Sequence, residues 1–161
     1  MNFAGALLRT AIKPRAHLLD PMVHHLRVSP LELNLGGHMD NVRYLKLMSQ
    51  ARNEFFLRTG MAKLALTQRV SLPLAASEMS YRRSLLLGQK FELETRLIGW
   101  NEKWFYIKQR MSREEKTVCE GMFRSAFLGK SGVQEPGRLF SEIHGSELAS
   151  PALPEETFYS V

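Results

Sequence analysis

The chain contains a single cysteine, Cys119, among 161 residues. One cysteine cannot form an internal disulfide or build a zinc site by itself, so we expect a small buried side chain in a strand and a reducing, cytoplasmic setting. The adjacent residues His24 and His25 point to opposite faces of a strand, so the pair cannot bind one metal together. The sequence therefore predicts neither a disulfide framework nor a metal site.

Long apolar runs and blocks of like charge are also missing. No stretch approaches the ~18 apolar residues that a membrane-spanning helix needs. The 22 Lys and Arg residues outnumber the 16 Asp and Glu residues and give a net charge of +6. This balance favours an anionic partner, with ordinary solvated surface charge as the alternative. Because the basic residues are scattered and no interleaved aromatic and basic motif occurs, we predict no nucleic-acid partner.

The composition is that of one globular domain, with 44% hydrophobic and 24% charged residues. Residues 1–21 differ from the rest because they hold three basic residues and no acid before Asp20. Their apolar residues at roughly helical spacing are Phe3, Leu7, Leu8 and Ile12. We expect a short amphipathic helix that packs on its own domain or, through residues 1–20, makes a weak contact with an anionic membrane or a partner subunit. A resemblance to an organelle transit peptide is a third interpretation.

The strongest periodic signal covers residues 41–59. Apolar side chains form a wide stripe there, consisting of Tyr44, Leu45, Leu47, Met48, Ala51, Phe55 and Phe56. Asp40 is a good N-cap, Arg58 favours the C-terminal end of the helix dipole, and Gly60 suits the position after the last turn. The pattern predicts a long central helix that a sheet wraps.

The other segments supply that sheet. The predicted strands are residues 22–29, 64–72, 75–84, 90–100, 103–112 and 117–129, followed by a surface extension with one short helix at residues 137–144. Consecutive hairpins imply antiparallel pairing, so a strand, a long helix and then several strands give an α+β class. One sheet around one helix leaves an open edge, which predicts a homodimer or a dimer of dimers.

Reactive side chains gather just before the central helix. Gly36, Gly37, His38, Asp40 and Asn41 fall in one short turn. The turn leads to a helix N-terminus, where unpaired backbone N–H groups and the helix dipole favour a developing negative charge. The sequence therefore predicts that chemistry takes place here.

Two segments and the order of elements resemble the hotdog-fold thioesterases of the 4-hydroxybenzoyl-CoA thioesterase-like group. Residues 32–44 (ELNLGGHMDNVRY) resemble that family's Asp-x-Asp-x-x-Gly-His-Val/Met-Asn-Asn-x-x-Tyr turn, and residues 80–93 (SYRRSLLLGQKFEL) resemble its second signature. Residues 99–111 look like the hairpin that follows. The resemblance implies a single hotdog domain over residues 22–130, between the segment 1–21 and the extension 131–161.

The resemblance implies hydrolysis of an acyl-CoA thioester without a metal or other cofactor. In the family an Asp four residues before the His acts as nucleophile or base, and that position is Asn34 here. An amide is neither a nucleophile nor a base, so Asn34 either orients water or the substrate carbonyl, or is a turn residue that tolerates left-handed backbone. Glu32 and Asp40 are the nearest carboxylates that could act as base, with Glu32 on the side of Asn34 if the segment is extended. Asp40 as a simple N-cap is the alternative.

The remaining candidate residues concern the oxyanion and the substrate. The N–H of Asn41 is expected to polarise the thioester carbonyl. His38 either donates to a carbonyl, acts as a base, or only shapes the turn. The residues expected to bind substrate are Gly37, Tyr44, Tyr81, Arg82 and Arg83, with Lys90 as a further candidate for phosphate contacts. Tyr44 could equally pack in the core, and the three cations could be solvated. A non-catalytic protein that binds acyl-CoA or an acyl carrier protein is the alternative function.

Overall fold

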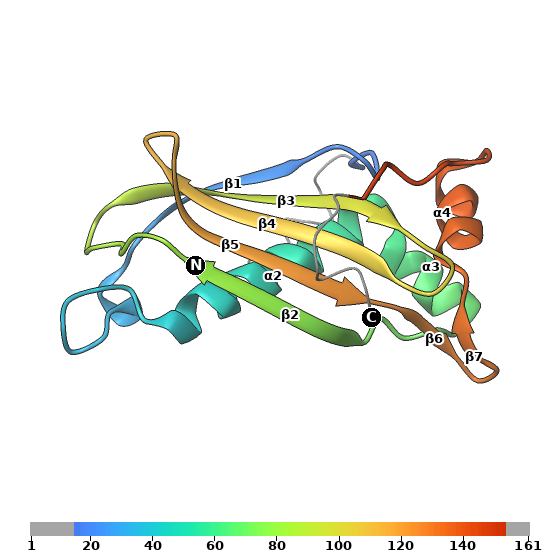
Figure 1. Cartoon of the computed structure of the whole chain (residues 1–161), viewed down its shortest axis with the longest axis horizontal. Helices are drawn as coiled ribbons and strands as arrows, with labels where there is room; N and C mark the ends of the chain where they lie inside the picture. The colour runs from blue at the N-terminus through green and yellow to red at the C-terminus, as the bar shows by residue number, and fades with distance from the viewer. Residues whose placement is uncertain (1–14, 154–161) are drawn as a thin grey trace.

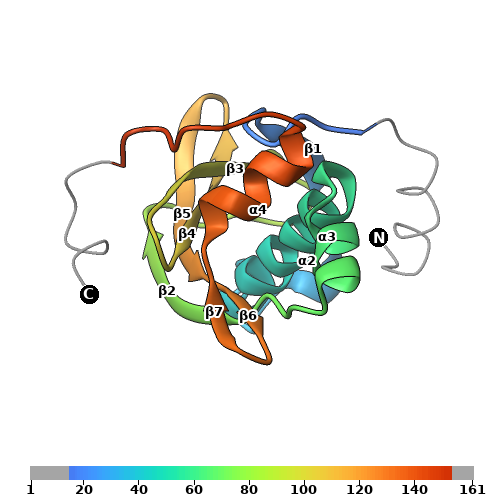
Figure 2. The same ribbon diagram turned by 90° about the vertical axis from the view of Figure 1, so that its right-hand side faces the viewer.

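In the computed structural model of the chain, residues 15–153 are described. Residues 1–14 and 154–161 lie outside the described part, and with them most of the predicted amphipathic segment and its expected membrane or partner contact. A five-stranded antiparallel sheet curves around one long helix, α2 (Asn41–Thr59), and the strand order is β1-β3-β4-β5-β2 (Figures 1 and 2). The strands are β1 (Met22–Arg27), β2 (Leu74–Tyr81), β3 (Lys90–Trp100), β4 (Phe105–Arg113) and β5 (Lys116–Ser125). The predicted α+β class is confirmed.

The central helix has the predicted ends. The Asp40 side chain accepts a hydrogen bond from the N–H of Val42 at 2.8 Å, and Gly60 ends the helix in the left-handed conformation with φ of 90°. Met48 and Phe55 on the predicted stripe are fully buried against the sheet. Local capping and apolar periodicity therefore agree, which is why this helix could be predicted from sequence.

The predicted strand at residues 64–72 is wrong. Residues 61–68 form a second helix, α3 (Met61–Gln68), which follows directly after Gly60 and buries Met61 and Leu64. Its sequence, MAKLALTQ, consists mostly of good helix formers, and a short apolar run cannot be assigned to helix or strand by its periodicity. Arg69, with φ of 53°, ends the helix.

The predicted strand at residues 117–129 is divided in two. Ala126 leaves the sheet and its N–H donates to the carbonyl of Pro73, so β5 ends at Ser125. Residues beyond it form a small hairpin, β6 (Phe127–Gly129) and β7 (Gly132–Gln134), which the sequence interpretation missed. The strand predicted at residues 103–112 starts later, at Phe105, because the Asn101 side chain accepts from the N–H groups of Lys103 and Trp104 and extends the turn.

The segment after residue 130 contributes to the core. The last helix, α4 (Pro136–His144), lies across the end of the molecule, as Figure 2 shows. Its Leu139 and Phe140 are fully buried, and the Phe140 ring lies 4.8 Å from that of Trp100. The expectation that this whole segment lies on the surface is wrong for α4, because aromatic packing ties the helix to the sheet.

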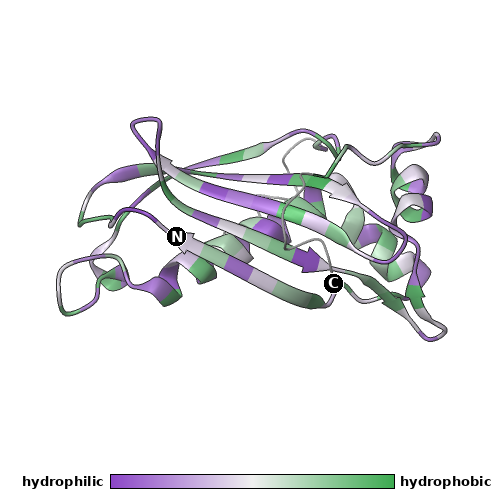
Figure 3. Cartoon of the chain, viewed as in Figure 1, coloured by the Kyte–Doolittle hydropathy of each residue, from purple (hydrophilic) through white to green (hydrophobic). Residues whose placement is uncertain are grey.

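β3 alternates between a buried inner face and a polar outer face. Its Phe91, Leu93 and Thr95 are buried as predicted, whereas the neighbouring β4 and β5 contain runs of buried residues. Figure 3 shows polar and apolar residues mixed along the strands. Cys119 of β5 is fully buried, and burial followed by the nearby Glu120 charge raises the pKa of its thiol to about 12. The predicted buried cysteine in a strand is confirmed, and the raised pKa keeps its thiol protonated and unreactive.

Candidate functional site

The segment before the central helix begins with one turn of 3-10 helix, η1 (Pro30–Glu32). The N–H of Ser29 donates to the Glu32 carboxylate at 2.7 Å, and the N–H of Asp40 donates to the Glu32 carbonyl at 2.9 Å. Glu32 therefore holds both ends of the segment together. Leu33, between Glu32 and Asn34, is extended, but Glu32 itself belongs to η1 and its carboxylate bonds to Ser29 and not beside Asn34.

Asn34 closes the loop that follows. Its side-chain oxygen accepts from the N–H groups of Gly36 at 2.9 Å and His38 at 3.2 Å. Its own N–H donates to the His38 carbonyl at 2.7 Å, and its carbonyl accepts from Gly37 at 3.1 Å. Asn34 is thus the turn residue that the sequence allowed, although its backbone is not left-handed. An aspartate carboxylate could accept the same two bonds.

The two glycines of the loop are needed for its shape. Gly37 has φ of 77°, which residues with a side chain rarely adopt. A Cβ atom on Gly36 would lie 3.3 Å from the Asn34 side-chain oxygen. A side chain at Gly37 would therefore strain the backbone before His38, and a side chain at Gly36 would press on the Asn34 oxygen that closes the loop.

The loop delivers the chain to the N-terminus of α2. Asp40 caps the helix, since its side chain accepts from Val42 and its carbonyl accepts from the N–H of Arg43 at 2.9 Å. Between residues 15 and 153, no hydrogen bond uses the N–H of Asn41. This exposed donor at the positive end of the helix dipole can stabilise an oxyanion.

His38 lies at the exposed side of the same loop. Its backbone pairs with Leu86, while no described residue forms a hydrogen bond with either nitrogen of its ring. The imidazole can therefore exchange a proton with water or a bound ligand. The His38 ring nitrogens are both available to a ligand, whereas one carboxylate oxygen of Glu32 and one of Asp40 already accept a backbone hydrogen bond.

The end of β2 and the segment after it pack beside the loop. The N–H of Met39 donates to the carbonyl of Leu85, and the N–H of Leu85 donates to the Tyr44 hydroxyl at 3.2 Å. The rings of Tyr44 and Tyr81 meet edge to face with centroids 5.6 Å apart. Burial is the main cause of the raised pKa of both hydroxyls. Tyr44 is buried and Tyr81 is 43% exposed, so only Tyr81 offers substantial surface to a ligand.

The two predicted phosphate-binding arginines lie beside β5. The Arg82 guanidinium is 3.3 Å from the Glu120 carboxylate on the outer face of the sheet, and Arg83 donates to the carbonyl of Thr117 at 2.9 Å. Lys90 begins β3 and is exposed. The structure therefore brings Asn34, Gly37, His38, Asp40 and Asn41 together, while the Glu32 carboxylate and the two arginines bond outside this loop.

A buried polar network under the sheet was missed by sequence interpretation. The Gln109 side chain donates to the Met48 carbonyl at 3.0 Å and to the Thr95 hydroxyl at 2.8 Å, and accepts from Arg52 at 2.8 Å. The Arg52 guanidinium lies 3.8 Å from the centroid of the Phe123 ring, and burial lowers its pKa to about 10. The available signal was a glutamine between Ile107 and Met111, on the apolar face of a strand.

A second pair links α2 to β1. The His24 ring nitrogen lies 3.0 Å from the Glu54 carboxylate, with both side chains nearly buried, and Arg58 lies 3.8 Å from the other oxygen of Glu54. His25 points outward, 3.3 Å from Glu92, so the two histidines diverge as predicted. Within residues 15–153, no cluster of three His, Cys, Asp or Glu residues could hold a metal. The same residues include no helix that is long and apolar enough to span a membrane.

Comparison with known sequences gives a family and several relatives. The sequence model of the thioesterase-like superfamily matches residues 28–157. Protein THEM6 of Xenopus laevis is 32% identical over 134 residues, which cover 82% of this chain and 63% of that protein. Protein THEM6 of Danio rerio is 38% identical over 97 residues, which cover 60% and 48%. The chain therefore spans about half to two thirds of the length of these curated relatives.

Solved structures show the same fold at low identity. A hypothetical protein from Staphylococcus aureus in complex with CoA has a TM-score of 0.69 and 16% identity, covering 88% of this chain and 94% of that one. A 4-hydroxybenzoyl-CoA thioesterase with an Asp-to-Asn mutation, in complex with 4-hydroxybenzoyl-CoA, has a TM-score of 0.66 and 15% identity, covering 76% and 97%. The hotdog fold predicted from sequence is confirmed.

Proposed function

Because this chain belongs to the thioesterase-like superfamily, we propose that it is an acyl-CoA thioesterase, which hydrolyses a thioester to a free acid and CoA. The observation that carries this proposal is the N–H of Asn41, which is exposed at the start of α2 and bonded to no described residue. Two neighbours of the same fold hold CoA or a CoA thioester. No metal or other cofactor is part of the proposed reaction.

The reaction uses the loop in two ways. The Asn41 N–H donates to the thioester oxygen, and its bond strengthens as that oxygen gains negative charge in the tetrahedral intermediate. His38 takes a proton from the attacking water, whose oxygen bonds to the thioester carbon. The carbon–sulfur bond then breaks, and the proton passes from His38 to the leaving thiolate. A positioned acid–base group of this kind contributes about 10²–10⁴ in rate.

His38 is preferred as the base over the two nearby carboxylates. One oxygen of Glu32 holds the N–H of Ser29, and one oxygen of Asp40 holds the N–H of Val42. Each bond occupies a carboxylate oxygen that a base would need to accept the proton of water. The imidazole of His38 bears no such restraint among residues 15–153.

The surface around the loop suits an acyl chain and a partner subunit. Large apolar side chains are exposed there: Leu31, Leu35, Val42, Leu45, Tyr81 and Leu86. Clusters of exposed apolar residues mark ligand or protein contacts. Gly37 and Tyr81 border the place where the acyl group would lie, and Arg82 or Arg83 would exchange its present partner for a CoA phosphate.

A homodimer completes the proposal. β2 is an edge strand of eight residues, LAASEMSY, with no Lys, Arg or Pro to block pairing. An exposed edge without such protection favours pairing with another strand. We expect two copies to join through β2, and equilibrium sedimentation should then give twice the mass of one chain. Assembly into a dimer of dimers stays a prediction.

The direct test is hydrolysis of an acyl-CoA panel. The panel contains straight-chain acyl groups of increasing length and aryl groups, and release of free thiol is followed. At least one member should turn over well above its spontaneous rate. An absence of turnover across the panel, with a folded protein, contradicts the proposal.

Asn34 favours one alternative, a protein that binds acyl-CoA or an acylated carrier protein without hydrolysis. Its amide occupies the position of the family's acid, and both of its side-chain bonds serve the loop. The net charge of +6 suits an acidic carrier protein. On this alternative the natural chain binds the thioester intact, and Asn34→Asp creates turnover. Turnover by the natural chain excludes it.

A further inference from the structure

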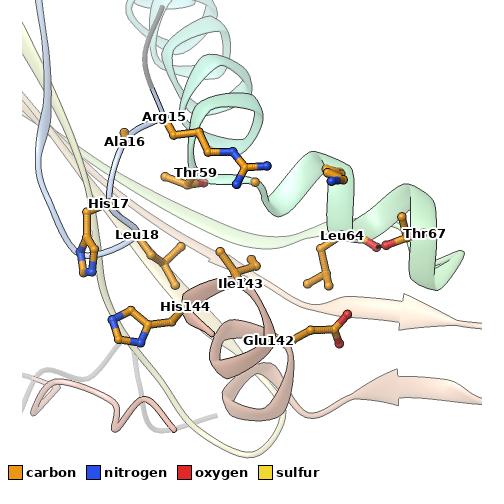
Figure 4. Close-up of a pocket in the computed structure, with 12 residues that line it drawn as sticks. Arg15, Ala16, His17, Leu18, Thr59, Leu64, Thr67, Glu142, Ile143 and His144 are labelled. Carbon is orange, nitrogen blue, oxygen red and sulfur yellow. Dashed lines mark hydrogen bonds between the residues drawn. The ribbon is translucent and has the colours of Figure 1, made fainter. Parts of the chain in front are cut away.

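A cavity lies at the opposite end of α2 from the proposed thioester site. Its volume is about 390 Å³, within the range of small-molecule sites. The segment before β1, the junction of α2 and α3, and the end of α4 enclose it (Figure 4). Because α2 has 19 residues, this junction is about 28 Å from Asn41. The cavity is therefore separate from the loop that holds His38 in the same subunit.

The charge that lines this cavity is unbalanced. Arg15 and Lys63 both line it, and neither has a carboxylate within ion-pair distance among residues 15–153. Glu142 is the lining carboxylate, and both of its oxygens accept from the Gln68 amide at 3.0 and 3.1 Å. Among the described lining residues, the cations Arg15 and Lys63 outnumber the single carboxylate of Glu142, so the lining is positive by one charge.

Two histidines form one end of the cavity. The rings of His17 and His144 meet edge to face with centroids 5.3 Å apart, and Figure 4 shows them side by side, away from Glu142. The His144 Nδ1 atom lies 2.9 Å from the Ser146 hydroxyl, and the His17 Nδ1 atom accepts from the N–H of Leu19 at 3.3 Å. In this arrangement the Nε2 atom of His17 carries the proton and is a donor.

The floor of the cavity is apolar. Leu18 and Leu64 are buried, and Ile143 lies between them in Figure 4. The hydroxyls of Thr59 and Thr67 donate to helix carbonyls at 2.7 and 3.0 Å, so they present only acceptor electron pairs. A ligand therefore meets hydrocarbon below and cations at the rim.

We propose that this cavity binds a small phosphate monoester that carries a short apolar group. A phosphate monoester has a charge of about −1.5 to −2 at pH 7 and three acceptor oxygens, so Arg15 and Lys63 can bond to separate oxygens of one ligand. A carboxylate brings less charge and one oxygen fewer. The apolar group rests on Leu18, Leu64 and Ile143, and the histidines close the end. This site is additional to the proposed thioesterase reaction and does not depend on it.

The test uses phenyl phosphate as the probe and the full-length chain, with binding followed by calorimetry. Two comparison ligands are used. Inorganic phosphate lacks the apolar group, and benzoate lacks the second charge. Phenyl phosphate should bind with saturation and more tightly than either, and its affinity should fall as salt is added. Equal affinity for benzoate, or no saturation, overturns the proposal.

Variants locate the site. Arg15→Gln and Lys63→Gln should each weaken phenyl phosphate binding roughly tenfold, the loss expected for one charge-assisted hydrogen bond. Lys46→Gln, which removes an exposed charge from the other half of α2, should leave binding unchanged. Equal losses in all three variants would show general electrostatic attraction and contradict the proposal. The melting temperature of each variant confirms that it is folded.

A CoA titration distinguishes this site from the proposed substrate site. If the cavity is separate, Lys63→Gln leaves CoA affinity unchanged and CoA does not displace phenyl phosphate. Displacement by CoA, with parallel losses in Lys63→Gln, would assign the cavity to CoA phosphate and overturn a separate ligand. Failure of acyl-CoA hydrolysis leaves the outcome of this test unaffected.

Discussion

Polar residues gather at two places on α2, the loop at its N-terminus and the network around Gln109 at its middle, and their hydrogen bonds serve different purposes. At its N-terminus, side chains of Asn34 and Asp40 bind the backbone of their own loop and leave the Asn41 N–H exposed. In its middle, Arg52 of α2 donates to Gln109 of β4, so helix and sheet are joined by a bond to a fully buried glutamine. The first arrangement leaves a donor available to a ligand, whereas the second uses its donors for folding. The comparison separates residues that should affect chemistry from residues that should affect stability.

The largest effect should come from the loop, in the variant His38→Gln. Loss of the proposed base should lower kcat by about 10²–10⁴, which corresponds to roughly 3–5 kcal/mol, with little change in the melting temperature. Steady-state thiol release measures it. His25→Gln, an exposed histidine on β1, is the control and should keep full activity. Unchanged kcat in His38→Gln would remove His38 from the mechanism.

The next largest effect should come from the buried network, in Gln109→Leu. This change leaves the Met48 carbonyl, the Thr95 hydroxyl and the Arg52 guanidinium without their partner. We expect a loss of about 2–3 kcal/mol in the free energy of unfolding, measured with denaturant. The neighbouring exposed Arg110→Gln should change it by less than about 0.5 kcal/mol. A stability loss no greater than that of the control would show that the network contributes little.

The elements that could be predicted from sequence have strong local signals. Most of the strand at residues 90–100 alternates, and α2 combines a periodic stripe with a cap at each end, so both were placed with the right bounds. By contrast, α3 is one short apolar run whose periodicity does not distinguish a helix from a strand. The strands β6 and β7 have three residues each, which are too few to show a periodic pattern.

The geometry of the candidate site could be predicted only where its residues are close in sequence. Its loop residues are neighbours in sequence, so their proximity follows from the turn. The direction of the Glu32 carboxylate could not be predicted, because Glu32 ends a 3-10 turn that brings it to the N–H of Ser29. The Gln109 network depends on contacts between residues 57 and 61 positions apart, which turn chemistry does not encode.

A smaller effect should separate the two roles of Asp40. Asp40→Asn keeps an oxygen for the Val42 N–H, while Asp40→Ala removes it and should cost about 1 kcal/mol of stability. If Asp40 is only a cap, Asp40→Asn should retain both activity and stability. Activity lost in Asp40→Asn at unchanged melting temperature would make Asp40 the base in place of His38.

The most direct test of the central claim is a single-turnover experiment with the natural chain in excess over an acyl-CoA that it binds. The proposed mechanism predicts complete release of free thiol in one exponential phase, slowed about 10²-fold or more in His38→Gln. An acyl-CoA that stays bound and intact for the natural chain would contradict hydrolysis and leave the loop as a binding site.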